Sequence, residues 1–352
     1  MKKAVSILTA ACLALSLAAC SSGSPSSAAA DPSSTSDASE SSSAETAEDT
    51  GTDASAAAYT IGICQQQPHE ALDAATQGFK DALVEAFGED GVTFDEQNAQ
   101  GDSNTCATII NGFVSGGYDL IMANGSSALQ AAAAGTADIP ILGTSVTEYG
   151  VALGIDGFDG TVGGNVSGTS DLAPLDQQAQ MLADFFPADQ YPTVGMLYCS
   201  AEPNSAYQVE QVTSYLTEMG YTVEDYSFSD SNDLATIATN ASTSCDVLYI
   251  PTDNTAASNT EIIQNICLPA GVPIIAGEEG ICGGCGVATL SISYYDLGYA
   301  TGEMAVKVLS GEADIAEMPI EYAPNFTKKY NAANAEALGV AIPEDYEAIA
   351  AE

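Results

Sequence analysis

The 352-residue chain has 48 acidic and only six basic residues, all of them lysines, which give a formal net charge of −42. A chain without arginine or a basic patch cannot neutralise phosphates, so nucleic acid is excluded as a partner. Ligands that depend on a bidentate arginine clamp, such as phosphates or dicarboxylates, are disfavoured for the same reason. With 46% hydrophobic residues, the chain is long enough for two domains of ordinary size.

The first 20 residues have the pattern of a secretory signal. Lys2 and Lys3 form a positive start, an apolar run follows over 4–16, and small residues then precede Cys20. This end resembles the bacterial lipobox, so we expect Cys20 to be lipidated. The apolar run is too short for a membrane-spanning helix, and no second long run follows. We therefore expect an exported protein that is anchored by lipid to the outer face of the cell membrane.

Residues 21–58 consist mainly of Ser, Ala, Thr, Asp and Glu and contain no aromatic residue. Such a segment cannot bury enough apolar surface to offset the entropy lost on ordering. The composition predicts a disordered tether between the lipid and a folded region that begins at residue 59.

The first half of the folded region alternates strands and helices. A strand over 60–64 is followed by a polar turn over 65–70 and by a helix over 70–87, whose apolar residues fall on one face. Strands over 92–97, 119–123 and 139–143 and helices over 104–115 and 126–135 follow. This order with short connections predicts a parallel sheet covered by helices on both faces.

The alternation stops in a glycine-rich segment over 144–166 and resumes after a weak strand over 166–169. We expect helices over 175–186, 205–219, 234–243 and 256–268, and strands over 193–198, 222–228, 246–250, 272–276 and 287–292. An amphipathic helix over 296–309 is expected to return to the first domain, and residues 320–352 to pack on the second. The chain is thus predicted to form two similar α/β lobes, each with a doubly wound parallel sheet, with a cleft between them.

Polar side chains follow the predicted strands in both halves, at the edge where ligands bind in open α/β sheets. Ser126, Ser127 and Ser205 are also ordinary N-cap residues, and capping is the alternative explanation for them. Hydroxyls and free N–H groups at helix N-termini suit a carboxylate, whereas Asp253 and Glu278 suit an ammonium group. This inventory predicts a small zwitterion, such as an amino acid, as the ligand. The candidate binding residues are Gln65, His69, Ser126, Ser127, Thr144, Ser145, Asn204, Ser205, Asp253, Asn254 and Glu278.

Seven cysteines follow Cys20, an odd number that leaves at least one unpaired if the others form disulfides. Cys282 and Cys285 have CxxC spacing, but neither a nearby histidine nor a second CxxC completes a zinc site. We expect this motif in a glycine-rich loop, whereas a thioredoxin-type motif opens a helix. Structural cysteines are favoured, with no metal and no cofactor, and the sequence leaves their disulfide state open. They are Cys64, Cys106, Cys199, Cys245, Cys267, Cys282 and Cys285.

No catalytic motif is visible. The chain has no GxSxG elbow, no P-loop and no GxGxxG after a strand. His69 is the only histidine, and no nucleophile pairs with it, because Cys64 is expected inside a strand. The sequence therefore favours a binding protein over an enzyme.

Six short segments between positions 65 and 298 together resemble the substrate-binding lipoproteins of ABC importers, in particular the family associated with tryptophan or tyrosine uptake. The resemblance implies the type I periplasmic-binding-protein fold, with two lobes and a three-segment hinge, and implies a permease and an ATPase as partners. It assigns ligand roles to Gln65, His69, Asn204, Ser205, Asp253 and Asn254. The segments are Gln65 with His69 and Ala71-Leu72-Asp73, then Asn98–Asp102, Gly168–Asp171, Asn204-Ser205, Pro251–Asn254 and Tyr294–Gly298.

With this fold, we assign residues 1–20 to the signal, 21–58 to the tether, 59–168 plus 293–317 to the N-terminal lobe and 169–292 plus 318–352 to the C-terminal lobe. Two loops depart from the family pattern and leave the exact ligand open. Pro68-His69-Glu70 stands where relatives tend to have Glu-His-Pro, and the loop over 278–286 contains two cysteines.

The sequence thus predicts a protein that captures a zwitterion, with an aromatic amino acid preferred, and delivers it to a permease. A sugar is the weaker ligand, because sugar sites commonly use tryptophan and arginine and the chain has neither. A surface adhesin or sensor that keeps the fold is the alternative of another class. Four tyrosines are candidates to stack on an aromatic ligand, with core packing as their alternative role: Tyr149, Tyr207, Tyr294 and Tyr295.

Overall fold

The computed structural model describes residues 59–350, which belong to one compact unit. The predicted signal sequence, the lipidation site at Cys20 and the tether over 21–58 lie outside the described residues. Among the helices that are described, none is long and apolar enough to cross a membrane.

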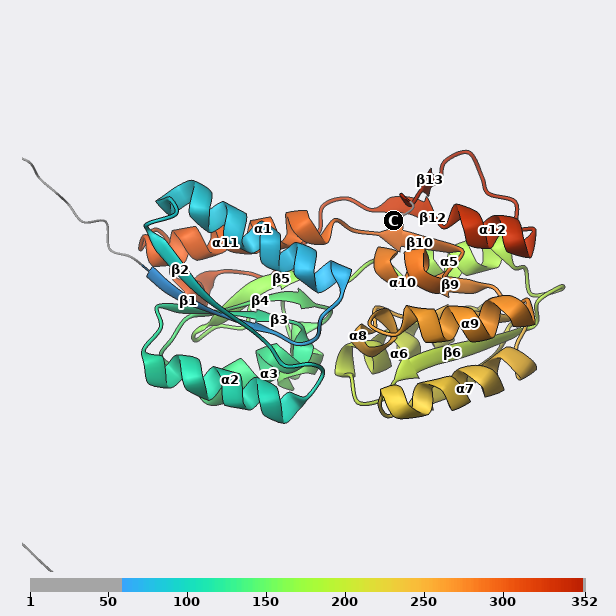
Figure 1. Cartoon of the computed structure of the whole chain (residues 1–352), viewed down its shortest axis with the longest axis horizontal. Helices are drawn as coiled ribbons and strands as arrows, with labels where there is room; N and C mark the ends of the chain where they lie inside the picture. The colour runs from blue at the N-terminus through green and yellow to red at the C-terminus, as the bar shows by residue number, and fades with distance from the viewer. Residues whose placement is uncertain (1–58, 351–352) are drawn as a thin grey trace, which may run out of the picture. The chain divides into compact units, whose positions relative to one another are not determined.

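The first lobe is built on a six-stranded sheet in the order β11-β5-β4-β3-β1-β2, with every neighbouring pair of strands parallel (Figure 1). The strands are β1 (Tyr59–Gln65), β2 (Val92–Asn98), β3 (Leu120–Asn124), β4 (Ile141–Val146), β5 (Val166–Ser170) and β11 (Glu321–Tyr322). The helices are α1 (Glu70–Phe87), α2 (Ser103–Gly116), α3 (Ser126–Gly135), α4 (Tyr149–Leu153) and α11 (Tyr294–Leu309), with a 3-10 turn at Ile315–Glu317.

Alternate residues of the first sheet bury against opposite helix layers, as the strand period of two requires. Leu120 and Met122 of β3 pack with residues of α1 and α11, whereas Ile121 and Ala123 pack with residues of α2 and α3. Helices α1 and α11 lie side by side on one face (Figure 1). The helix expected over 296–309 therefore returns to the first lobe, as predicted.

The second lobe has a seven-stranded sheet in the order β13-β12-β10-β9-β8-β6-β7, parallel except where β12 runs antiparallel to β10. Its strands are β6 (Thr193–Cys199), β7 (Thr222–Phe228), β8 (Val247–Ile250), β9 (Ile274–Ala276), β10 (Ala288–Ser291), β12 (Thr327–Tyr330) and β13 (Glu347–Ala348). Its helices are α5 (Leu175–Phe185), α6 (Pro203–Glu218), α7 (Ser231–Ser244), α8 (Asn254–Ala257), α9 (Thr260–Ala270), α10 (Glu279–Cys285) and α12 (Ala332–Leu338).

The chain passes between the two sheets three times, over 171–174, 292–293 and 323–326. Two of these passages differ from the expected boundaries. β5 continues in the first sheet to Ser170, beyond the expected boundary after residue 168. β11 pairs with β5, so the last passage follows Tyr322, whereas the boundary was expected after residue 317. The physical reason is that β11 forms backbone hydrogen bonds with β5, which would otherwise be an edge strand. Backbone pairing of this kind leaves no side-chain pattern in the sequence.

Three short helices, α4, α10 and α12, were not anticipated, and one helix is divided. Glu148 caps α4 and Glu278 caps α10, each by accepting hydrogen bonds from backbone N–H groups of the first turn. The expectation that the CxxC motif lies in a loop was wrong, since Cys282 and Cys285 both lie within α10. The single helix expected over 256–268 is divided into α8 and α9.

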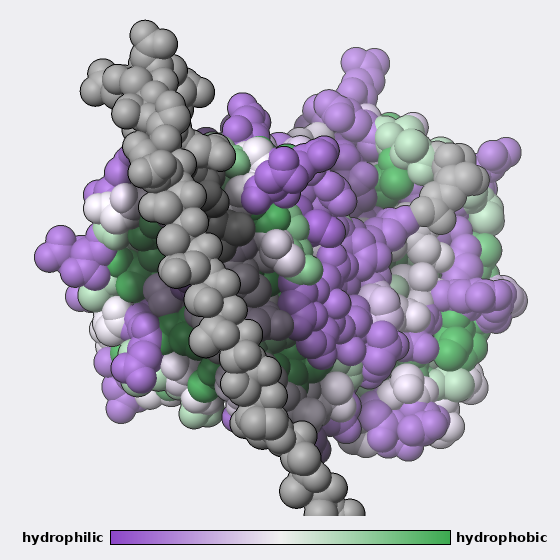
Figure 2. All heavy atoms as spheres, turned by 60° about the vertical axis from the view of Figure 1, so that its left-hand side comes forward, coloured by the Kyte–Doolittle hydropathy of each residue, from purple (hydrophilic) through white to green (hydrophobic). Residues whose placement is uncertain are grey.

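All seven described cysteines are buried and unpaired. Five of them, those of the second lobe, belong to one apolar cluster formed by α7, α9, α10 and the sheet beneath them. In the part of the chain that the structure describes, no cluster of His, Cys, Asp or Glu side chains could hold a metal ion. The surface in Figure 2 is largely hydrophilic with scattered apolar residues, as the acidic composition requires.

Candidate functional site

A small cavity lies between the lobes, at the carboxyl ends of the strands. Its volume is about 10 Å³, room for a single water-sized group. Residues from both lobes and from one of the passages between them line it. They are His69, Leu72, Ser145, Asp171, Asn204, Thr252, Asp253, Asn254, Ala257, Glu278 and Tyr294.

Three of these side chains have a buried polar atom without a hydrogen-bond partner among the described residues: Ser145 Oγ, Asp171 Oδ1 and Asn204 Oδ1. Their side chains are strongly buried, with residue exposures of 6%, 4% and 5%. An unpaired buried polar group costs about 1–3 kcal/mol, so three around one cavity indicate a site built for a polar ligand.

Ser145 reaches the cavity through a strained backbone. Its φ of 54° is in the left-handed region, which non-glycine residues seldom adopt. The strain coincides with an irregularity in the pairing of β4 with β5 between Gly143 and Val146. Such conformations persist where the surrounding structure enforces them, and they concentrate at functional sites.

Asp171 lies in the first passage between the lobes. Its Oδ2 accepts a hydrogen bond of 2.9 Å from the hydroxyl of Tyr294, the first residue of α11. Burial raises the pKa of Asp171, and the Tyr294 hydrogen bond opposes that shift. The nearby Thr147 hydroxyl also lowers the pKa of this carboxyl, but neither that hydroxyl nor Asp171 Oδ1 has a hydrogen-bond partner among the described residues. Asp171 Oδ1 therefore remains available to a ligand.

Asn204 is the second residue of α6, and its amide orientation is fixed by its neighbours. Nδ2 donates to the Thr252 carbonyl at 3.0 Å and is also within hydrogen-bond distance of Ser205 Oγ and Glu202 Oε2. Reversing the amide would set Oδ1 against the Thr252 and Glu202 oxygens. The assignment therefore leaves an acceptor, Oδ1, at the cavity.

The lobes also contact each other directly through hydrogen bonds. His69 Nε2 lies 3.0 Å from Asn254 Oδ1, and the Ser258 hydroxyl donates to the Pro68 carbonyl at 3.1 Å. Asn254 Nδ2 donates to Glu202 Oε2 at 2.6 Å, so Oδ1 is the atom that faces His69. Burial lowers the pKa of His69, which favours the neutral ring with Nε2–H donating to Asn254. We call the His69–Asn254 hydrogen bond the interlobe latch.

Asp253 and Glu278 line the cavity, but their oxygens are already engaged. Asp253 accepts from the backbone N–H groups of Cys199 and Ala256, and Glu278 accepts from two N–H groups at the start of α10. Burial raises the pKa of each to about 7, and the charge of Glu202 adds to the shift at Asp253. Both oxygens of each carboxylate are therefore already used to hold the surrounding backbone, although the sequence predicted that they would contact a ligand's ammonium group.

Six of the eleven predicted binding residues line the cavity: His69, Ser145, Asn204, Asp253, Asn254 and Glu278. The other five, Gln65, Ser126, Ser127, Thr144 and Ser205, do not. Gln65 uses both ends of its amide within the first lobe, on Gln67, Asp73 and Thr76. The Thr144 hydroxyl pairs with that of Thr169, and the Ser127 N–H donates to Gln66.

Sequence reasoning did not select Asp171, although it lies in one of the six family-like segments. It considered Tyr294 only as a stacking residue. The remaining tyrosine candidates differ: Tyr149 is buried in the first-lobe core, Tyr207 packs against the second-lobe core, and Tyr295 lies at the adjoining groove described below. The sequence signal that could have found Asp171 is an acidic residue directly after a buried β-strand.

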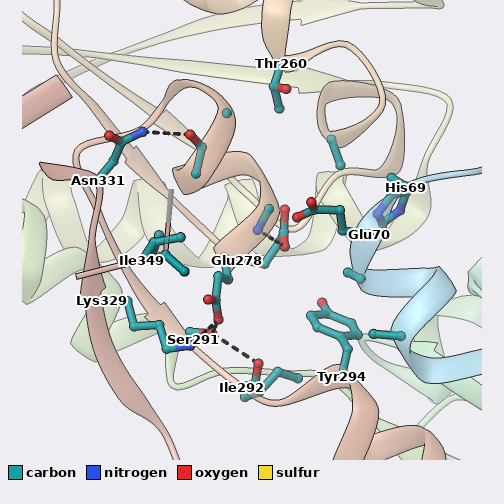
Figure 3. A pocket seen from close by; sticks show the side chains of 18 of the residues that line it. His69, Glu70, Thr260, Glu278, Ser291, Ile292, Tyr294, Lys329, Asn331 and Ile349 are labelled. Atoms are coloured by element: carbon teal, nitrogen blue, oxygen red, sulfur yellow. Dashed lines mark hydrogen bonds and ion pairs between the residues drawn. The ribbon is translucent and has the colours of Figure 1, made fainter. Parts of the chain in front are cut away.

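A larger groove of about 1030 Å³ adjoins the cavity (Figure 3). Four residues line both spaces: His69, Ala257, Glu278 and Tyr294. At the groove's other side, Lys329 of β12 forms an ion pair of 2.6 Å with Glu279. In Figure 3, His69, Glu70 and Tyr294 lie on one side of the groove and Lys329, Asn331 and Ile349 on the other.

Comparison with known proteins shows the family to which this chain belongs. The model of the ABC transporter substrate binding protein family matches residues 60–352. A tyrosine-binding protein of Clostridioides difficile strain R20291 is 36% identical over 262 residues, which are 74% of this chain and 75% of the relative.

Two solved structures are also similar. An ABC domain from Streptococcus pneumonia in complex with L-Trp is 32% identical, with a TM-score of 0.77 over 82% of this chain and 97% of that chain. A substrate binding protein with adhesive properties from Clostridium difficile, in its ligand-free, open form, is 36% identical, with a TM-score of 0.64 over 84% and 100%. The more identical chain thus superimposes less well.

The lobes of the present chain touch through the latch, and the chain superimposes better on the L-Trp complex than on the ligand-free, open structure. Fold, cavity position and sequence similarity over nearly the whole described region agree. The chain belongs to the family of ABC transporter substrate-binding proteins and has the two-lobed α/β architecture of type I periplasmic binding proteins.

Proposed function

We propose that this chain captures an aromatic amino acid outside the cell and delivers it to the permease and ATPase of an ABC importer. The main observation is the cavity between the lobes, where buried polar atoms from both lobes lack partners. Two relatives support the ligand class, since one is named a tyrosine-binding protein and another was solved with L-Trp.

The mechanism is closure of two lobes about the ligand. A ligand favours the closed form only by the interactions that it gains there and lacks in the open form. Ser145 comes from the first lobe and Asn204 from the second, while Asp171 lies between them. A ligand that bonds to all three can do so only when the lobes are together, so binding and closure are coupled.

The aromatic ring requires more room than the inner cavity provides. The groove beside the cavity is large enough, and Tyr294 and His69 lie at the boundary between the two spaces. Both rings can contact an aromatic side chain in offset or edge-to-face geometry, which adds about 0.5–1.5 kcal/mol beyond the area buried. We place the ligand's side chain at this boundary.

We further propose that the mature protein is held at the outer face of the cell membrane by lipid on Cys20. The support is the signal-like sequence over 1–20, and the acidic tether over 21–58 would give the lobes reach from the membrane. Metabolic labelling with a fatty-acid analogue tests this, and Cys20→Ser should abolish labelling and release the protein from the cell.

A thermal-shift screen of the chain from residue 21 onward, against amino acids and sugars, tests the ligand. At 100 times Kd, a ligand of the native state adds about 2.7 kcal/mol. With about 2.1 cal/mol/K of unfolding entropy per residue, a domain of this size should gain about 4 °C with tyrosine, tryptophan or phenylalanine. A rise only with a sugar would keep the fold and refute the aromatic amino acid.

A surface adhesin is the second candidate function, because the Clostridium difficile relative is described as having adhesive properties. Binding of the purified chain to an epithelial monolayer tests it. Adhesion without any small-molecule thermal shift would favour this function over import.

A further inference from the structure

We propose that the inner cavity is a socket for a primary ammonium group, held by Ser145, Asp171 and Asn204. Recognition would then depend more on the ligand's amine than on its carboxylate. This inference rests on the proposed binding function but goes further, because it names the chemical group that is recognised and the side chains that recognise it.

The unpaired atoms match an ammonium group in number and kind. An ammonium carries three N–H donors and no acceptor. The cavity offers three unpaired oxygens: Asn204 Oδ1 and Oδ1 of ionised Asp171 only accept, while Ser145 Oγ can accept. A hydroxyl or carboxylate ligand could not satisfy all three oxygens at once.

The acidic lining of the cavity also favours a cation, which would stabilise the ionised form of its buried carboxyls. Asp171, Asp253 and Glu278 line it, and no lysine of the described chain does. Of the four described lysines, three pair with carboxylates at the surface or at the groove. The chain has no arginine. A cationic group would therefore be the only positive charge in contact with these buried carboxyls.

The cavity has the size of such a group. Its volume of about 10 Å³ holds one water-sized group, and an ammonium is of that size. The remainder of the ligand must leave the cavity, and the adjoining groove shares His69, Ala257, Glu278 and Tyr294 with it. An amine bearing an aromatic tail fits this pair of spaces.

Partners for a ligand carboxylate are fewer, because protein carboxylates occupy the neighbouring helix starts. Asp253 caps α8 and Glu278 caps α10. The backbone N–H groups of Asn254 and Thr255 donate instead to Glu202. A carboxylate at these helix starts would compete with the protein's own acidic groups.

Calorimetric titration of the chain from residue 21 onward with three related compounds tests the socket. L-Tyrosine has both charged groups, tyramine lacks the carboxylate, and 3-(4-hydroxyphenyl)propionate lacks the amine. We expect tyramine to bind within about tenfold of tyrosine and the deaminated acid about 100-fold more weakly, since hydrogen bonds to charged groups are the stronger class.

Asp171→Asn is the main variant, because it removes the charge and keeps an oxygen to accept from Tyr294. It should weaken tyrosine and tyramine binding about 10- to 100-fold. Ser145→Ala should weaken both about five- to tenfold without touching the Asp171–Tyr294 bond. Asp176→Asn, the same change five residues along at an exposed position, should have no effect.

The outcomes separate the socket from the proposed function. Equal binding of the deaminated acid and tyrosine, or unchanged tyrosine binding by Asp171→Asn, would overturn the socket and leave the aromatic amino acid function intact. Binding of tyramine without tyrosine would support the socket and refute the amino acid as ligand. If none of these compounds binds, butylamine and putrescine are compared with 1-butanol, and failure of both amines would also overturn it.

Discussion

The buried carboxyls at the cavity predict that the ligand-free protein loses stability between pH 5.5 and pH 7. The pKa of Asp253 rises to about 7 from an ordinary 3.8, and that of Glu278 to about 7 from 4.5, chiefly through burial. At a pH between the ordinary and the raised pKa of each carboxyl, the native protein holds a proton that the unfolded chain has released. The free energy of unfolding must therefore fall as pH rises.

The magnitude follows from the proton difference. Each carboxyl contributes about 1.4 kcal/mol per pH unit, so two of them give about 4 kcal/mol over 1.5 units. His69 acts in the opposite direction below pH 6.5, because burial lowers its pKa, and it offsets part of this loss. The raised pKa of Asp171 adds to the loss. A net fall of about 3 kcal/mol corresponds to about 5 °C in Tm.

Urea unfolding and thermal unfolding at pH 5.5, 6.5, 7.0 and 8.0 measure this dependence. Glu278→Gln should reduce the slope of the unfolding free energy against pH by the contribution of about one proton. This holds even if the substitution also changes the stability at any single pH. Asp176→Asn, at an exposed position, should leave the dependence unchanged. Stability that is constant or higher at pH 8 in the wild type, or a slope that Glu278→Gln retains, would refute the reasoning.

Two further predictions concern closure and helix packing. Asn254→Ala removes the acceptor of the interlobe latch, so the ligand-free protein should show a larger radius of gyration in small-angle scattering, whereas His69→Gln, which keeps a donor, should remain compact. Gly298→Ala should lower Tm markedly or prevent folding, because a Cβ there would lie 1.9 Å from the Ala75 carbonyl oxygen, where α11 crosses α1. Gly112→Ala, whose Cβ would meet open space in α2, should be neutral or stabilise by up to about 1 kcal/mol, and an equal effect of both substitutions would contradict the packing argument.

Secondary structure and lobe architecture were largely predictable, because they depend on local periodicity. The apolar face of the helix expected over 70–87 and the buried strand before it are both visible in the sequence, and both occur in the structure as α1 and β1. Alternation of such units predicts a parallel sheet, and two series of them predict two lobes. Family-like segments spread from Gln65 to Gly298 pointed to the same architecture.

Elements that depend on distant partners were not predictable. β11 has two residues and exists because the edge of β5 accepts them. The seven-residue helix α10 contains three glycines, and each glycine in a helix interior costs about 1 kcal/mol relative to alanine. It forms because Glu278 caps its first turn and because Cys282 and Cys285 bury in the second-lobe core. No local pattern reports those contacts.

The candidate site was also predictable only in part. The sequence alone determined that polar loops follow the strands and meet at a cleft, since parallel strands end at one edge of their sheet. Only the tertiary structure decided which carboxylate is available to a ligand. Asp253 is satisfied by backbone N–H groups of its own helix and of Cys199, 54 residues away, whereas Asp171 keeps one oxygen unpaired between the lobes. Hydrogen-bond satisfaction depends on neighbours that folding brings together, and the order of residues does not contain it.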